Sequence, residues 1–113
     1  MNVSDWIMER IADEGVKHVF FVPGGGAMFL NDALIRQKRI TPVCMLHEQA
    51  AGIAAEAYAQ YTGGLGVCLV TSGPGGTNAV TPCAAAWIDS TPVLFISGQV
   101  STDQMMGPGQ RQG

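Results

Sequence analysis

The residue best suited to acid–base chemistry in this sequence is Glu48, which follows a short apolar run and opens an alanine-rich stretch. An apolar setting favours the protonated form of a carboxyl group, whereas the start of a helix favours its charged form. Such opposed effects would let Glu48 share a proton with a ligand nitrogen. The alternative is a first-turn glutamate that only complements the helix dipole. The residues alone leave both interpretations open.

Two glycine-rich turns stand before and after this glutamate in the sequence. Pro23-Gly24-Gly25-Gly26 follows one apolar run, and Ser72 to Asn78 follows another. Glycines allow a backbone to approach a flat or charged ligand closely. Neither turn matches the GxxxxGK[ST] or GxGxxG phosphate-binding pattern, so each could also be a simple packing turn. Two such turns at neighbouring strand ends favour a binding cleft.

Other residue types that could do chemistry are given structural interpretations. His47 could contact a substrate, but a histidine at a strand end more often caps backbone groups, and we favour that role. Four aromatic residues with helical spacing are interpreted as packing residues: Trp6, Tyr58, Tyr61 and Trp87. The cysteines lie in apolar or alanine-rich runs, which predicts reduced, buried thiols and no metal site; they are Cys44, Cys68 and Cys83.

The elements that must position these residues alternate between helix and strand. Helices are predicted over Val3–Glu14, Ala27–Gln37, His47–Tyr61 and Asn78–Ile88, and strands over His18–Val22, Pro42–Leu46, Gly66–Thr71 and Val93–Ser97. Continuously apolar strands suit a sheet that is buried on both faces. The pattern therefore predicts a three-layer α/β fold, a parallel sheet with helices on both faces. Ligands bind such sheets beyond the carboxyl ends of the strands, where Glu48 and both glycine turns should lie.

Composition indicates that this domain packs against something else. The chain has 113 residues, of which 47% are hydrophobic and 13% are charged, against about a quarter charged in an ordinary domain. Helical segments around Ala50–Ala59 and Ala84–Ala86 carry small residues on every side, which is typical of helices buried all round. We hypothesise that these helices form a subunit interface.

Several classes of partner are disfavoured by the charge and hydropathy patterns. The net charge is −3, and only Arg36, Lys38 and Arg39 cluster, too few for a nucleic-acid footprint. No apolar run is long enough to cross a membrane, and Met1 to Arg10 lacks the apolar core of a signal peptide. We therefore expect a protein of the cytoplasm that binds neither nucleic acid nor membrane.

Taken in order, the motifs closely resemble the N-terminal pyrimidine-binding domain of the thiamine diphosphate-dependent enzymes, in particular the acetolactate synthase-like family. The resemblance runs from about Ser4 to Gln99. It is carried by Pro23-Gly24-Gly25, His47-Glu48-Gln49-Ala50-Ala51, Val70 to Asn78, and Asp89-Ser90-Thr91-Pro92. Val22 and Gly26 depart from the tyrosine and alanine usual in acetolactate synthases, and the tail from Gly107 to Gln112 is closer to members from nucleotide-sugar and polysaccharide pathways.

The resemblance implies a carboligase or decarboxylase that acts on a 2-keto acid. The glutamate matching Glu48 hydrogen-bonds N1′ of the aminopyrimidine and thereby activates C2 of the cofactor, and Gln110 would approach the substrate. The remaining cofactor-binding residues carried over are Pro23, Gly24 and Gly25, bordering the cofactor across a dimer, and Thr71, Pro74 and Asn78, lining the pyrimidine pocket. The active site of the implied homodimer or homotetramer lies between subunits.

The family binds Mg²⁺ and the diphosphate through a GDG-to-Asn motif in a separate C-terminal domain, which residues 1–113 do not contain. We therefore expect the chain to be the truncated N-terminal part of the pyrimidine-binding domain, inactive alone and without metal ligands. An alternative is a non-catalytic dimerisation or regulatory module that needs a partner chain. A flavodoxin-like or Rossmann nucleotide-binding domain is disfavoured, because no dinucleotide fingerprint follows the first strand.

Overall fold

A computed structural model describes residues 1–105. The helices are α1 (Val3–Asp13), α2 (Met28–Arg36), α3 (Glu48–Thr62), α4 (Pro74–Asn78) and α5 (Val80–Ile88), and 3₁₀ turns lie at Gly25–Ala27 and Thr102–Gln104. The strands are β1 (His18–Phe21), β2 (Thr41–Cys44), β3 (Gly66–Val70) and β4 (Val93–Ser97). They form one four-stranded sheet in the order β2-β1-β3-β4, and all pairs are parallel. This confirms the predicted α/β fold.

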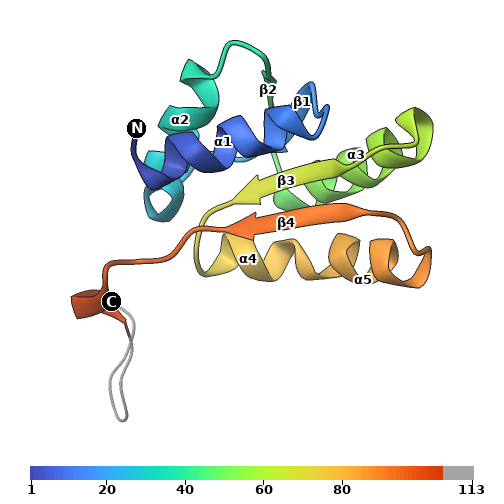
Figure 1. The fold of residues 1–113 in the computed structure, drawn as a ribbon. Helices are drawn as coiled ribbons and strands as arrows, with labels where there is room; N and C mark the ends of the chain where they lie inside the picture. Colours follow the sequence, from blue (N-terminus) through green and yellow to red (C-terminus); the bar gives the residue numbers. More distant parts are fainter. Residues whose placement is uncertain (106–113) are drawn as a thin grey trace.

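Helices cover both faces of the sheet (Figure 1). Helices α1 and α2 pack together on one face, and α3, α4 and α5 lie on the other. Beneath α1 and α2 is the larger core, made of Met8, Ile11, Val16, Val19, Phe21, Ala27, Ala33, Leu34, Ile40, Val67 and Leu69. The core beneath α3 is built of small residues, Ala51, Ala55, Cys68, Val70 and Ala79. Every residue of β3 is buried, as the continuous apolar run predicts.

The segment after β3 differs from the prediction. The sequence predicts a loop over residues 72–76 and one helix from Asn78, but α4 already begins at Pro74 and α5 follows it from Val80. Proline suits the first turn of a helix, because its missing N–H has no helical partner there. Gly73, with φ +63°, turns the chain into α4. Gly75 and Gly76 therefore lie within a short helix, and Gly73 precedes it.

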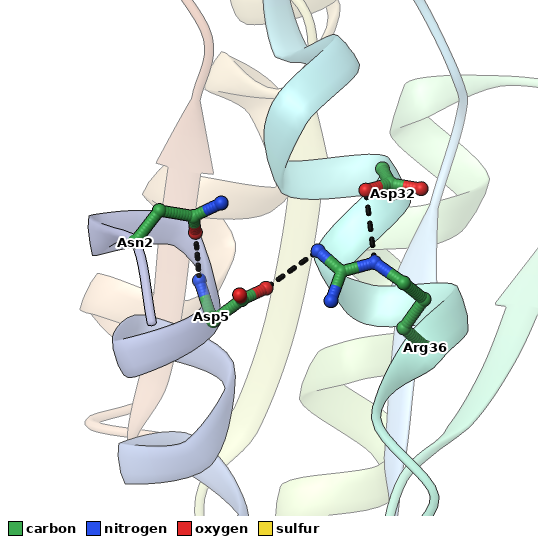
Figure 2. Close-up of polar contacts among 4 residues, drawn as sticks. All are labelled: Asn2, Asp5, Asp32 and Arg36. Carbon is green, nitrogen blue, oxygen red and sulfur yellow. Dashed lines mark hydrogen bonds and ion pairs between the residues drawn. The ribbon is translucent and has the colours of Figure 1, made fainter.

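Ion pairs tie the two helices of the first face together (Figure 2). The Asn2 side chain caps α1 by accepting a hydrogen bond from the Asp5 N–H at 2.8 Å. The Arg36 guanidinium lies between the carboxylates of Asp5, at 2.6 Å, and Asp32, at 2.9 Å. The hydrogen bond from the Arg36 guanidinium holds the pKa of the Asp5 carboxyl group below its usual value. Arg36 and Asp32 are exposed and Asp5 is partly exposed, so the ion pairs orient α1 on α2 more than they stabilise the fold.

Several residues predicted to be buried are exposed. Of the four aromatic residues, only Tyr58 packs inside, with its ring edge-on to those of His18 at 5.5 Å and Phe20 at 5.8 Å. Trp6, Tyr61 and Trp87 are 57%, 94% and 85% exposed, so their prediction as packing residues is wrong among residues 1–105. Cys44 and Cys83 are exposed too, and only Cys68 is buried. Helical spacing groups residues on one side, but it does not say whether that side faces the sheet.

No helix within residues 1–105 has the length and apolar character needed to cross a membrane.

Close packing of α3 on the sheet gives a testable prediction. A Cβ at Gly66 would lie 2.1 Å from the Ala55 carbonyl oxygen, which is backbone and cannot rotate away. We expect Gly66→Ala to lower the free energy of unfolding by about 1–3 kcal/mol, because α3 must shift. Gly64→Ala is the control, since its Cβ would meet only Thr62 Oγ1, at 3.6 Å. Equal urea midpoints for the two variants would contradict this packing.

Candidate functional site

The sheet order places two loops side by side at the carboxyl edge. The chain passes from β1 to β2 on one side and then crosses to β3 on the other side of β1. The turns that follow β1 and β3 are therefore neighbours, although β2 and α3 separate them in the sequence. In open parallel sheets such a reversal of strand order leaves a crevice where ligands bind.

The two glycine turns touch through Thr71, the residue after β3. The Gly26 N–H donates a hydrogen bond to Thr71 Oγ1 at 3.0 Å. A Cβ at Gly24 would lie only 2.5 Å from Thr71 Cβ, and one at Gly26 would lie 2.7 Å from Ser72 Oγ. Gly24 and Gly26 are therefore explained by close packing of one turn on the other.

Gly25 has no such explanation. No atom lies within 4 Å of the position its Cβ would take, and its φ is not in the left-handed region. Gly25 and the preceding Pro23 are both exposed at this edge. Neither packing nor conformation in residues 1–105 calls for a glycine here, so the open space beside Gly25 is suited to the close approach of a ligand or partner.

Glu48 is the first residue of α3, but it does not cap the helix. His47 takes that role, since its Nδ1 accepts a hydrogen bond from the Gln49 N–H at 3.0 Å. The capping interpretation of His47 is confirmed. The Glu48 carboxylate is thereby left for other partners.

One oxygen of Glu48 is held by the segment after β3. Asn78, the last residue of α4, donates a hydrogen bond from its side-chain amide to Glu48 Oε1 at 3.1 Å. This is the one side-chain hydrogen bond of Glu48 among residues 1–105, and it leaves the other oxygen, Oε2, without a donor from these residues. A Cβ at Gly75 would lie 2.9 Å from Thr71 Cγ2 and 3.7 Å from this oxygen. Glu48, Thr71, Gly75 and Asn78 thus form one cluster with an unused carboxylate oxygen.

Cys68 lies in β3 under α3 and is fully buried. Burial raises the pKa of its thiol to about 12, and the negative charge of Glu48 adds to the shift. The thiol is therefore neutral at physiological pH, where a thiolate would be needed for nucleophilic chemistry. Its effect at the site is that of a small apolar residue.

The structure brings together most of the residues that the sequence proposed for cofactor binding. Glu48, Gly24, Thr71 and Asn78 are linked by the contacts above, while Pro23, Gly25 and Pro74 lie exposed on the same loops. Gln110 lies outside the described residues. Gly75 and Gly98 are not among the residues predicted to bind a cofactor. The position of Gly98 directly after a predicted strand, at the ligand-binding edge, is the signal that could have found it.

Compared with known proteins, residues 1–112 match the family described as "Thiamine pyrophosphate enzyme, N-terminal TPP binding domain". The chain belongs to this family. Thiamine pyrophosphate is the same compound as thiamine diphosphate, so the resemblance stated from the motifs is confirmed at family level.

Relatives of this thiamine pyrophosphate enzyme domain include acetolactate synthases. The large subunit of isozyme 3 from Escherichia coli is 46% identical over 102 residues, which is 90% of this chain and 18% of that protein. Acetolactate synthase 2 from the chloroplast of Nicotiana tabacum is 48% identical over 97 residues, covering 86% of the chain and 15% of the relative. The large subunit from Buchnera aphidicola is 42% identical over 102 residues. The chain spans less than a fifth of the length of these relatives.

The raised pKa of Cys68 predicts how the domain reacts with alkylating reagents. We expect Cys44 to be labelled in the folded protein, because its side chain is exposed. Cys68 should stay unlabelled in the folded protein, since its thiol is buried and titrates only near 12, and should be labelled after unfolding in urea. Peptide mass mapping measures both sites. Labelling of Cys68 at the rate of Cys44 before unfolding would contradict its burial.

Proposed function

We propose that this chain is part of a thiamine diphosphate-dependent 2-keto acid carboligase or decarboxylase of the acetolactate synthase type, in which Glu48 activates the cofactor. The observation that carries the proposal is the state of the Glu48 carboxylate. Asn78 fixes one of its oxygens, and the other is left without a partner beside two glycine turns. The acetolactate synthase relatives support the reaction class.

The residues present fit an aminopyrimidine ring. A flat heterocycle needs backbone that can come close to its faces, and the open space beside Gly25 allows such an approach at the sheet edge. A ring nitrogen needs a group that can share a proton with it, and Glu48 Oε2 is that group. Both features lie where open parallel sheets bind ligands.

Each residue of the cluster has a distinct task in this proposal. Glu48 Oε2 would share a proton with a ring nitrogen of the bound cofactor, since general acid–base groups of this kind act over hydrogen-bond distances. Asn78 keeps the carboxylate in one orientation, so that the proton is presented in one direction. Pro23 and Gly25 form the exposed border of the site, and Thr71 and Pro74 line it from the neighbouring turn. When bound, the cofactor supplies the electron sink for cleavage next to a carbonyl group.

Other parts of the catalytic centre are proposed to come from outside residues 1–105. Among the described residues no cluster of His, Cys, Asp or Glu could hold a metal ion. We propose that a further domain binds Mg²⁺ and the diphosphate. Residues 1–113 would then be the N-terminal part of the pyrimidine-binding domain and would be inactive alone. We also propose that Gln110 approaches the 2-keto acid.

Replacement of the proposed activating residue tests this function. In the native, full-length protein we expect Glu48→Gln to lower kcat for 2-keto acid turnover by about 10²–10⁴-fold, because the amide cannot exchange the proton. Thiamine diphosphate should still bind, as seen by calorimetry, since the side chain keeps its size. Glu14→Gln removes the same charge from an exposed pair with Arg10 and should leave kcat unchanged. Full activity in Glu48→Gln would refute the role.

We also propose a homodimer or homotetramer in the cytoplasm, with the active site between subunits. A large apolar surface supports assembly, because the outer side of α5 exposes Val80, Trp87 and Ile88. The alternative function is a non-catalytic dimerisation or regulatory module, which would use the same surface. It is distinguished by the Glu48→Gln variant, which would then have the same properties as the wild-type protein.

Cys83 lies on this surface of α5 and can report on its burial. In the assembled protein we expect a maleimide reagent to label Cys83 at least about tenfold more slowly than Cys44, because an intersubunit contact excludes the reagent. Cys44, exposed at the end of β2, is the internal control. Dissociation by dilution should bring the two rates together. Equal rates in the assembled protein would show that α5 faces solvent.

A further inference from the structure

The turn Gly24–Gly26 is held from two sides by segments much later in the chain. On one side, Thr71 Oγ1 accepts a hydrogen bond from the Gly26 N–H at 3.0 Å. On the other side, the Gln99 N–H donates to the Gly26 carbonyl oxygen at 3.0 Å. Both backbone polar groups of Gly26 are therefore used, one by the end of β3 and one by the segment that leaves β4.

Gly98 allows the second of these segments to come so close. A Cβ at this position would lie 2.2 Å from the Gly26 carbonyl oxygen and 2.7 Å from the Ala27 nitrogen, both backbone atoms. Its φ lies outside the left-handed region, so the close approach is the reason for a glycine. The segment cannot easily move away, because the Gly98 N–H donates to the Val70 carbonyl oxygen at 2.9 Å and continues the β3–β4 ladder.

Thr71 connects this turn to the catalytic cluster. Its side chain fills the space beside Gly24 and also lies against Gly75, next to Glu48. One side chain therefore sets the distance between the β1 turn and the carboxylate. A substitution at Thr71 or at Gly98 would therefore change the position of Gly25, and of the open space beside it, relative to Glu48.

We infer that Gly98 and Thr71 are positioning residues, which clamp the Gly24–Gly26 turn at the distance from Glu48 that the ligand needs. The inference rests on the proposed function in that thiamine diphosphate is the ligand. It makes the clamp a determinant of cofactor affinity, separate from the proton transfer assigned to Glu48.

Cofactor affinity in the full-length protein tests the clamp. We expect Gly98→Ala to weaken the Kd for thiamine diphosphate, measured by calorimetry with Mg²⁺ present, by about three- to tenfold, the equivalent of one hydrogen bond. At saturating cofactor kcat should stay near the wild-type value, because Glu48 and Asn78 are untouched. Gly64→Ala, which adds the same methyl group with only an ordinary contact, should leave the Kd unchanged. A merely structural role would lower the folded fraction and leave the Kd of the folded protein as it was.

A second pair of variants decides the matter if Gly98→Ala does not fold. Thr71→Val keeps the shape of the side chain but leaves the Gly26 N–H without its acceptor, and should weaken the Kd to a similar degree. Thr71→Ser keeps the hydroxyl and should restore most of the affinity.

If Thr71→Val binds thiamine diphosphate with the wild-type Kd, the clamp is overturned, whatever the result for Gly98→Ala. The proposed function fails by a different result, namely a wild-type protein that does not bind thiamine diphosphate or a fully active Glu48→Gln variant.

Discussion

The candidate site depends on the packing of Thr71 between two glycine turns. The sheet order makes the ends of β1 and β3 neighbours, but neighbouring strands alone would leave their turns free to diverge. The Thr71 hydroxyl binds one turn, and its carbon atoms fill the space left by Gly24 and Gly75. Since protein interiors tolerate few voids and little overlap, this contact fixes the separation of the two turns.

The side-chain contact of Glu48 is with another helix and not with the start of its own helix. A glutamate at the start of a helix is often accounted for by the helix dipole alone. Here the His47 side chain caps α3, and the Glu48 carboxylate turns toward Asn78 on another helix. The dipole interpretation gives no reason for that pairing. Its partner is a neutral amide, and none of the ion pairs among residues 1–105 involves Glu48.

Much of the fold could be predicted because its signals are local. Buried strands such as Gly66–Val70 are continuous apolar runs, and α1 and α3 end where Gly15 and Gly63 adopt a positive φ. The failures have a common cause in tertiary contact. Trp87 lies on an apolar helix whose sheet-facing side is taken by smaller residues such as Ala86. No spacing rule says which side that will be.

The candidate site, too, could be predicted where its signals are local and not where it depends on tertiary contact. Glu48 and Asn78 were each proposed from the family motifs, but their hydrogen bond joins residues 30 positions apart and depends on how α4 packs against α3. The sequence predicts a loop that includes residues 74–76, since proline and glycine are poor helix formers. The short helix they form instead is what directs the Asn78 amide at the carboxylate.

The glycines of the site can be separated by what each would meet if it had a side chain. Gly24, Gly26, Gly75 and Gly98 would each collide with this chain's own atoms, so their smallness serves the fold. Gly25 would collide with nothing, although it stands in the same turn and a larger residue would stabilise the turn by restricting the unfolded chain. A glycine that the fold does not require, beside an unused carboxylate oxygen, points to a molecule outside the described residues as the reason for it.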